Sequence, residues 1–345
     1  MPYYYPVRKM SDTVERSRIA ANLLKLREQL NRDIPPKTDA GSMLIATWNI
    51  RKFNDKRREE SLHYIAEIIS RFDLVAVQEV SADMAGLERL MKLLDLQWDY
   101  LVTDTTDGSA GNSERMAILY DRSKVTFRKM AGELVLAQDN LIGEDKLQFA
   151  RTPYTVAFQS GWFKFVLTTV HIFFGTATKK DKEKRRLEIA KITSVLGNRV
   201  KKEDMTYILL GDFNIPDTQD VMMQALTNNG FYVPDDIKAH PTDLGQVSHY
   251  DQIAFNTKLG PGMTIFSERG KTAGAFNFTE SVYGVDDWKT YLPYFAEQAA
   301  GKTEDEIKTY FRKTWRTFEM SDHLPLWVEL KTDFSDQYLR NIVNN

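Results

Sequence analysis

The alternation of short apolar segments with amphipathic helical patterns restricts the fold of this chain more than any other feature. The predicted strands cover residues 43–48, 73–78, 117–120, 125–128, 155–159, 163–171, 207–210, 251–255 and 326–330. The predicted helices of this part of the chain cover residues 57–72, 85–94 and 182–200. Strands that alternate with helices early in the chain, and follow one another later, predict a mixed β-sheet arrangement of the α/β (α+β) class.

Composition narrows the class of protein further. The chain has 345 residues, of which 42% are hydrophobic and 12% aromatic, so it can build a large core. With 46 Lys and Arg against 48 Asp and Glu, the net charge is -2, and any nucleic-acid surface must be a local patch. The absence of Cys excludes disulfides, thiolate nucleophiles and Cys-ligated metal centres.

The location of the protein is predicted from two further patterns. No apolar run approaches the ~18 residues that span a bilayer, so we expect no membrane insertion. The N-terminal residues lack the apolar region of a signal peptide, which favours a cytoplasmic location. Export of a precursor trimmed before this numbering stays open.

The chain divides into three predicted parts. Residues 1–42 form an N-terminal helical extension and linker, with a helix at 11–32 that Asp12 can cap. We expect this extension to pack on the main body or on a second copy of the protein, which would make 11–32 an oligomer contact. Residues 43–332 form one domain, in which 256–320 is an elaborated connection with a helix at 303–314, and residues 333–345 form a C-terminal tail.

Polar residues stand where the predicted strands begin or end. They are Asn49, Gln78, Glu79, His171, Asp212, Asn214, Asp251, Asp322 and His323. Strand ends present side chains to the crevice at the edge of a sheet. Carboxylate and amide oxygens in a chain without Cys suit Mg²⁺, Mn²⁺ or Ca²⁺ better than Zn²⁺.

Each of these motifs also has a purely structural interpretation. Glu79 could be a solvated carboxylate, and Asp212 with Asn214 could form an Asx turn. However, Asp212 and Asn214 are two residues apart, so on an extended chain both side chains lie on the same side of the chain. Gly211 would let a ligand approach the backbone. The residues at 322–323 could cap a turn. Coincidence explains any single motif better than it explains all of them in this order.

In that order, the motifs resemble the endonuclease/exonuclease/phosphatase superfamily, and within it deoxyribonuclease I most closely. The matching segments are 45–53, 78–80, 211–214, 250–253 and 321–323, and the resemblance spans about 43–330. It implies a four-layer sandwich of two packed mixed β-sheets flanked by helices, with the active site at one end. It also implies a metal-dependent phosphodiester hydrolase with Mg²⁺, or Mn²⁺ or Ca²⁺, that acts on nucleic acid, DNA being favoured.

The resemblance implies a role for each matching position. It implies that Glu79, Asn49 and Asp322 bind the metal ion. It also implies that Asp212 and Asn214 bind the attacking water and a phosphate oxygen. The two histidines that flank the scissile phosphate are His171 and His323, and the acids that pair with them are Glu114 and Asp251. The arginines that contact phosphate are Arg51 and Arg151.

Elementary chemistry supports such a set. A divalent ion and arginines neutralise charge that grows on the phosphoryl oxygens. Histidine titrates near neutral pH and can serve as base or acid, and a carboxylate behind the ring fixes its tautomer and raises its basicity. Which of the two histidines is the base stays open at this point.

Two departures from the deoxyribonuclease pattern predict weaker binding of double-stranded DNA. Ser81 stands where that pattern has a DNA-contacting arginine, and Asn112 where it has a tyrosine that packs on a sugar. Basic residues at 51–58 and 179–186 could compensate as substrate contacts, or could be ordinary solvated helix starts. His63 lies off the apolar face of its helix and is expected at the surface.

Two alternatives to the nuclease hypothesis remain. The first keeps the chemistry and changes the substrate to a small phosphoester, as in a phosphatase or phosphodiesterase. The second is a non-catalytic binding module on the same fold, against which the candidates at every catalytic position argue.

Overall fold

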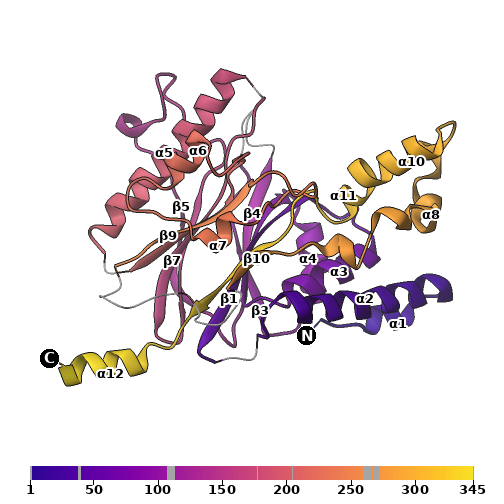
Figure 1. The fold of residues 1–345 in the computed structure, drawn as a ribbon, viewed down its shortest axis with the longest axis horizontal. Coiled ribbons are helices and arrows are strands. Elements are labelled where there is room, and N and C mark those ends of the chain that lie inside the picture. The colour runs from indigo at the N-terminus through magenta and orange to yellow at the C-terminus, as the bar shows by residue number, and fades with distance from the viewer. Residues whose placement is uncertain are drawn as a thin grey trace.

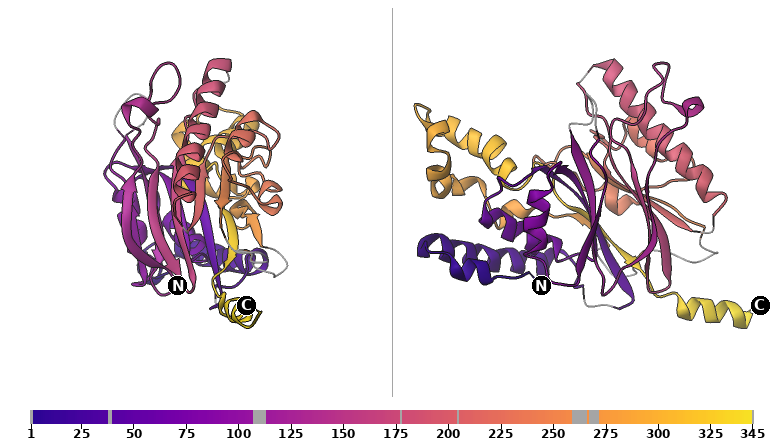
Figure 2. Two further views of the ribbon diagram at one scale, coloured as in Figure 1. Left: turned by 90° about the vertical axis from the view of Figure 1, so that its left-hand side faces the viewer. Right: turned by 180° about the vertical axis from the view of Figure 1, so that it is seen from behind.

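Two β-sheets packed face to face form the centre of the molecule (Figure 1, Figure 2). The computed structural model describes residues 2–37, 40–106, 113–176, 178–203, 205–258, 266 and 272–344. Its strands are β1 (Ser42–Phe53), β2 (Leu74–Ser81), β3 (Trp98–Val102), β4 (Glu114–Asp121), β5 (Thr126–Glu133), β6 (Tyr154–Ser160), β7 (Phe163–His171), β8 (Thr206–Asp212), β9 (Asp251–Asn256), β10 (Ala273–Ala275) and β11 (Leu326–Lys331).

Both sheets are mixed, as the sequence predicts. The described strands of the first run in the order β10-β11-β1-β2-β4-β3, and those of the second in the order β5-β6-β7-β8-β9. The pairs β1/β2 and β7/β8 are parallel, and the other neighbours are antiparallel. β1 is buried on both faces, since Ile45 belongs to the core between the sheets and Trp48 to the core under the helices.

Helices cover the outer faces of both sheets. They include α2 (Thr13–Asp33), α3 (Glu59–Ile69), α4 (Ala85–Met91), α5 (Lys179–Val200) and α6 (Val221–Leu226), whereas α12 (Ser335–Asn344) lies away from both sheets. Short ones are α1 (Tyr5–Lys9), α7 (Asp235–Lys238) and the 3₁₀ turns at Gln138–Asn140, Phe278–Glu280, Val285–Asp287 and Leu292–Phe295. α2, α3 and α4 lie on the side of the first sheet, and α5 and α6 on the side of the second (Figure 1). The four layers implied by the resemblance are therefore present.

The N-terminal helix packs on the body of its own chain. Asp12 caps α2, because its Oδ1 accepts hydrogen bonds from the backbone N–H groups of Val14 and Glu15 at 2.8 and 2.9 Å. Leu26 on its inner face is fully buried, and Arg18 forms an ion pair of 2.8 Å with Glu60 of α3. Packing on the main body is confirmed, while an oligomer contact through 11–32 stays a prediction.

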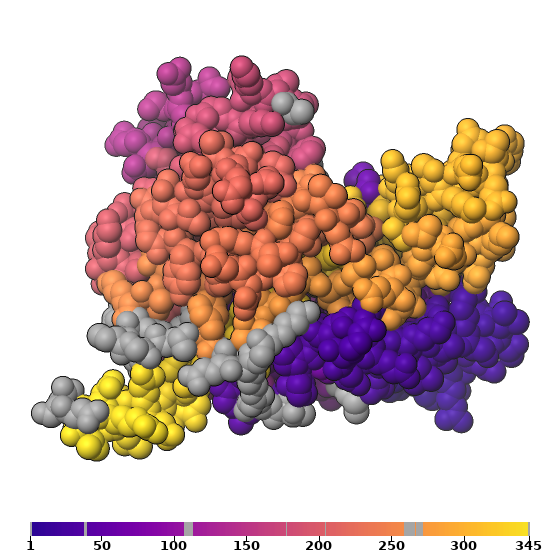
Figure 3. Space-filling model, viewed as in Figure 1, coloured from indigo at the N-terminus to yellow at the C-terminus, as the bar shows by residue number. Residues whose placement is uncertain are grey.

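A group of short helices projects beside α2 and α3 (Figure 1), and we call residues 276–320 the helical arm. In the space-filling view the arm forms a lobe next to the N-terminal segment (Figure 3). It contains α8 (Trp288–Tyr291), α9 (Ala296–Ala299), α10 (Glu304–Tyr310), a π-helical turn (Phe311–Trp315) and α11 (Arg316–Glu319). Tyr291 donates a hydrogen bond of 2.8 Å to Glu60, and the hydroxyl groups of Tyr283 and Ser61 lie 2.7 Å apart. The helix predicted at 303–314 is present as α10 and the π-helical turn.

Two expectations about exposure are wrong. His63 is buried (1% exposed), because α3 is covered on more sides than its apolar face, and all of its residues from 60 to 69 are buried. In the basic segments, Arg57 and Arg185 are buried and donate to backbone carbonyls, Arg57 to Phe318 and Arg185 to Asn214. These two arginines hold loops in place, and substrate contact by the other basic residues of the two segments stays a prediction.

The remaining expectations about organisation are only partly tested. Residues 335–344 of the predicted tail form the helix α12, which projects from the body (Figure 1). The boundaries at 42, 43, 332 and 333 stay predictions. Among the described helices, none combines the length and the apolar character that crossing a bilayer requires.

Candidate active site

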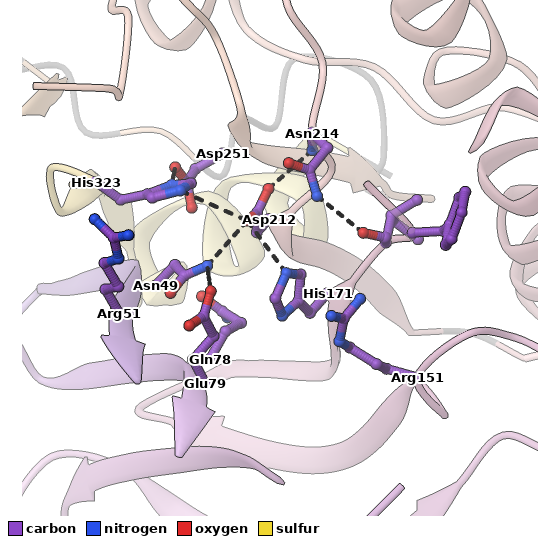
Figure 4. Close-up of polar contacts among 12 residues, drawn as sticks. Asn49, Arg51, Gln78, Glu79, Arg151, His171, Asp212, Asn214, Asp251 and His323 are labelled. Atoms are coloured by element: carbon purple, nitrogen blue, oxygen red, sulfur yellow. Dashed lines mark hydrogen bonds and ion pairs between the residues drawn. The ribbon is translucent and has the colours of Figure 1, made fainter. Parts of the chain in front are cut away.

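The predicted site residues meet at one edge of the sandwich, between the two sheets (Figure 4). The carboxyl ends of the parallel pairs β1/β2 and β7/β8 supply Asn49, Glu79, His171 and Asp212. The antiparallel neighbours β4 and β9 begin at the same edge, so their first residues, Glu114 and Asp251, join the set. The edge predicted from strand ends is therefore one location in space.

An irregularity in β2 aims Glu79 into this edge. The pairing of β2 shifts register between Val77 and Val80, and Glu79 has a φ of 61°, in the left-handed region that costs a non-glycine residue free energy. Its carboxylate accepts hydrogen bonds from Asn49 Nδ2 at 3.0 Å and from the Lys52 backbone N–H at 2.8 Å. Burial alone would raise the pKa of Glu79, but the nearby imidazoles and these hydrogen bonds lower it overall.

Asn49 connects the two sheets through its amide group. The Nδ2 that binds Glu79 also donates a hydrogen bond of 3.0 Å to Asp212 Oδ2. With both amide hydrogens directed at carboxylates, the opposite atom, Asn49 Oδ1, is buried without a hydrogen-bond partner. A buried carbonyl oxygen of this kind is a position where a cation ligand is expected.

The Asp212 motif combines the two interpretations that the sequence leaves open. Asp212 Oδ1 accepts the Asn214 backbone N–H at 2.8 Å, which is the Asx turn, while Oδ2 faces the centre of the site. Asn214 Nδ2 donates to the Ile172 carbonyl at 2.9 Å and so ties the loop to the end of β7.

The expected role of Gly211 is wrong. Its φ is 138°, and a Cβ atom there would lie 2.0 Å from the Val170 carbonyl oxygen. The space beside Gly211 is therefore filled by the neighbouring strand and is not open to a ligand. Gly211 instead allows β7 and β8 to approach closely, which sets His171 directly opposite Asp212.

His171 lies between two acids. Its Nδ1 is 2.7 Å from Glu114 Oε1, and its Nε2 is 3.5 Å from Asp212 Oδ2. Arg151 also contacts Glu114 through Nε, so this buried arginine lies behind the acid. Burial and the positive charge of Arg151 lower the pKa of His171 to about 4, and the ring is neutral at pH 7.

His323 repeats this arrangement on the other side of Asp212. Its Nδ1 is 2.7 Å from Asp251 Oδ2, and its Nε2 is 3.8 Å from Asp212 Oδ2. Burial opposes the charged ring, but the carboxylates of Asp251 and Asp212 raise the pKa of His323 well above its usual value. The Tyr250 ring packs against it, with centroids 5.6 Å apart.

Two groups of possible metal ligands therefore share this edge. The ligand atoms of Glu79, Glu114 and His171 lie within 4.8 Å of one another, and the same holds for Asp212, Asp251 and His323. Asn49 Nδ2 joins the two groups by bonding to one carboxylate in each.

Arg51 and Asp322 lie at the margin of the site, on the side of the helical arm. Arg51 Nη1 is 3.3 Å from Asp322 Oδ2 and donates a hydrogen bond of 2.6 Å to Thr317 Oγ1. Among the described residues, no contact joins Asp322 to Glu79. The roles of Asp322 as a metal ligand and of Arg51 as a phosphate contact stay predictions.

Sequence reasoning noted Gln78 and Ser321 but gave them no role, and it missed the two threonines that bond to Gln78. Gln78 Nε2 donates to Thr47 Oγ1 at 3.1 Å and to Thr169 Oγ1 at 3.0 Å, which links the sheets below Asn49. Ser321 Oγ donates to the Asn49 carbonyl at 2.6 Å. A polar residue beside each motif was a weak signal for these contacts. Of the two departures, Ser81 donates to Asp83 at 2.6 Å, and Asn112 lies outside the described residues.

Comparison with known proteins identifies the class. The family model described as "Endonuclease/Exonuclease/phosphatase family" matches residues 46–278, and the chain belongs to this family. Members of the family are metal-dependent hydrolases of phosphoesters, and the chain is therefore a phosphoesterase. The family predicted from the motifs is confirmed, whereas its closeness to deoxyribonuclease I stays a prediction. No curated protein sequence matches the chain.

Solved structures agree on the fold. A family protein from Bacteroides thetaiotaomicron is 18% identical with a TM-score of 0.55, covering 85% of this chain and 95% of that one. A mannosyl-6-phosphatase from the same organism is 16% identical (TM-score 0.53; 84% and 99% covered). D. rerio TDP2 complexed with a single-strand DNA product is 15% identical (TM-score 0.51; 84% and 99% covered).

Proposed function

We propose that this phosphoesterase hydrolyses phosphodiester bonds in nucleic acid with the help of a divalent metal ion, as a deoxyribonuclease I-like endonuclease. The observation that carries the proposal is the duplicated His–carboxylate pair. His171 with Glu114 and His323 with Asp251 approach Asp212 from two sides, each with Nε2 toward the same carboxylate oxygen.

The residues present fit a hard divalent cation. Glu79 and the unpaired Asn49 Oδ1 are oxygen donors, and the chain contains no Cys. We assign metal binding to Glu79 and Asn49, with Asp322 as a further candidate, and favour Mg²⁺ over Mn²⁺ or Ca²⁺. When bound, such an ion neutralises negative charge on the phosphoryl oxygens.

The protein groups account for the proton transfers of a hydrolysis. Water must lose a proton to attack phosphorus, and the leaving oxygen must gain one. Nδ1 of each imidazole lies 2.7 Å from its own carboxylate, so we assign the exchange of a proton to Nε2. Asp212 lies between the two Nε2 atoms, where it can orient water, and two such pairs on opposite sides suit in-line displacement.

A small phosphoester is the second candidate substrate. Ser81, which binds Asp83, supplies no cation where the deoxyribonuclease pattern has an arginine, so one of its duplex contacts is missing. The similar structures include both a mannosyl-6-phosphatase and a protein with a DNA product, and so the fold does not choose between the two.

The test is one substrate panel with and without EDTA. Supercoiled plasmid, single-stranded oligonucleotide and small phosphate monoesters and diesters are incubated with the protein and Mg²⁺. Cleavage of both nucleic acids that EDTA abolishes supports the proposal. Hydrolysis of the small esters alone favours the second candidate, and absence of hydrolysis with retained binding would identify a non-catalytic module.

A further inference from the structure

A groove of about 700 Å³ opens beside His323 and runs along the helical arm. Its lining joins the active site to the arm, because Asp322 and His323 line one part and Arg312, Lys313 and Arg316 another. A volume of this size accommodates a ligand as large as a nucleotide. The groove is therefore placed to receive the part of a substrate that extends beyond the reacting phosphate.

The acidic residues that line the groove, Asp243 and Asp322, already bond to other groups of the protein. Asp243 accepts hydrogen bonds from the backbone N–H groups of Gly245, Val247 and Ser248 at 2.6 to 2.9 Å. Asp322 pairs with Arg51 at 3.3 Å. Neither carboxylate is engaged with the three cations on the arm.

The three cations have no acidic partner in the part of the chain that the structure describes. Arg312 and Lys313 are exposed, whereas Arg316 is buried (6% exposed). Arg316 donates through Nε to the Arg312 carbonyl and through Nη1 to the Tyr283 carbonyl, both at 3.1 Å, and both acceptors are uncharged. Burial and the charge of Arg312 lower the pKa of Arg316 to about 10, so the cluster repels itself.

Local backbone geometry directs this cluster at the groove. The arm switches to a π-helical turn at Phe311–Trp315, between α10 and α11. π-helical turns are rare in proteins, and many of those that occur lie at functional sites. Arg312, Lys313 and Arg316 come from this turn and the residue after it. Arg51 fixes the arm to β1 by its hydrogen bond to Thr317, so the position of the cluster relative to the reacting centre is set.

We propose that Arg312, Lys313 and Arg316 form a second anion subsite, which binds a further phosphate group of the same substrate next to the phosphate that reacts. The inference rests on the proposed phosphoesterase function and deepens it, since it predicts a preference for substrates with at least two phosphates. An adjoining phosphate of a nucleic-acid strand and the second phosphate of a small bisphosphate share this chemistry.

The first test compares substrates that differ by one phosphate. The 4-nitrophenyl ester of thymidine 5′-phosphate is assayed with and without a 3′-phosphate, and the 3′-ester with and without a 5′-phosphate. Phosphate release from glucose 6-phosphate and glucose 1,6-bisphosphate forms the small-molecule arm. In the pair of substrates that the enzyme prefers, we expect kcat/KM to be higher by about tenfold or more for the substrate that has the second phosphate. An increase of this size is the effect of one hydrogen bond between charged groups.

The variant for this test is R312Q/K313Q, which changes two exposed side chains. The control is K302Q/K308Q, which removes the same charge from the same arm outside the groove. R312Q/K313Q should lose the preference through a higher KM, with unchanged turnover of the esters that have one phosphate. Equal kcat/KM within every pair, or a preference that survives in R312Q/K313Q, overturns the subsite.

A binding measurement separates this inference from the proposed function. Fluorescein-labelled octathymidylate is titrated in EDTA at several salt concentrations, and anisotropy gives the affinity. The slope of log K against log salt should be shallower by about 1.4 in R312Q/K313Q, at about 0.7 per lost phosphate contact on a single strand. Equal slopes in the wild type and in R312Q/K313Q refute the subsite for nucleic acid, even if no ester is hydrolysed. The comparison of glucose 6-phosphate with glucose 1,6-bisphosphate then decides whether the subsite binds the second phosphate of a small molecule.

Discussion

At the scale of single residues, the pKa values of the two imidazoles of the site shift in opposite directions, although each ring has a carboxylate at Nδ1. Each ring has its Nδ1 2.7 Å from a carboxylate, yet Arg151 stands behind the pair of His171, and among the described residues no arginine contacts the pair of His323. The pKa of His171 is therefore lowered by burial and by Arg151, while the pKa of His323 is raised despite burial by Asp251 and Asp212. His323 therefore holds a proton more readily than His171 does.

Loss of either ring should remove a proton transfer. We expect His171→Ala and His323→Ala each to lower kcat by about 10²- to 10⁴-fold, the usual contribution of a general acid or base. Steady-state hydrolysis in Mg²⁺ measures the effect, and circular dichroism shows whether the fold is kept. His249→Ala is the control, because no contact joins that side chain to the site among the described residues. Near-normal turnover in either site variant contradicts the scheme.

Glu79→Gln tests the metal assignment with a side chain of the same size. Removal of the negative charge should raise the Mg²⁺ concentration for half-maximal activity by about tenfold or more, since carboxylate oxygens are the preferred ligands of this ion. The measurement is an Mg²⁺ titration of hydrolysis. The exposed Glu28 of α2 provides the control E28Q, which has the same change of charge. An unchanged titration in E79Q would exclude Glu79 as a ligand.

At the scale of elements, the close pairing of β7 and β8 depends on one glycine. In Gly211→Ala the new Cβ would lie 2.0 Å from the Val170 carbonyl oxygen at a φ of 138°. We expect the free energy of unfolding to fall by about 3 kcal/mol or more and activity to fall with it, because backbone strain and a steric clash add. Urea unfolding followed by fluorescence measures the change.

Gly132→Ala in β5 is the matched control for this prediction. A Cβ atom there meets nothing within 4 Å, so the free energy of unfolding should change by no more than about 1 kcal/mol. Equal losses in the two variants would show that the approach of the strands at Gly211 has no special importance.

The contact of α2 with the body offers a similar comparison within one helix. Leu26 is fully buried, whereas Leu24 on the opposite face is 63% exposed. Leu26→Ala should lower the free energy of unfolding by about 2 to 5 kcal/mol, and Leu24→Ala by no more than about 0.5 kcal/mol. Thermal and urea unfolding give both values. A larger effect of Leu24→Ala, with a change of mass in solution, would indicate a contact between copies.

At the scale of the whole molecule, the sequence predicted the strands and long helices of the layers better than the short elements beside them. Short, nearly continuous apolar runs locate strands such as 43–48 and 163–171, because both faces of each strand are buried. They did not locate β3 or the short helices α8 and α9, whose positions depend on contacts between distant segments, such as Tyr291 with Glu60. His63 was assigned to the surface because helical periodicity does not reveal a second covering layer.

The candidate site was predictable to a similar depth. Strand ends indicated that Glu79, Asp212 and His323 would gather at one edge, since the directions of the strands fix that edge. The bulge that turns Glu79 inward and the unpaired Asn49 Oδ1 arise from register and three-dimensional packing. Likewise, the lining of the groove by Arg312 follows from a π-helical turn that no apolar period announces.

The convergence of acids also predicts how metal affects the stability of the whole molecule. Glu79 with Glu114, and Asp212 with Asp251, belong to two adjoining groups of possible metal ligands, in which like charges repel one another. A cation bound only by the folded state stabilises it by about 3 kcal/mol at a hundred times its Kd. Mg²⁺ should therefore raise the Tm of the wild type above its value in EDTA, and KCl of equal ionic strength should raise it less. In E79Q, where binding is about tenfold weaker or more, the increment due to Mg²⁺ should fall to about half or less, and equal increments in the two proteins would mean that the ion binds elsewhere.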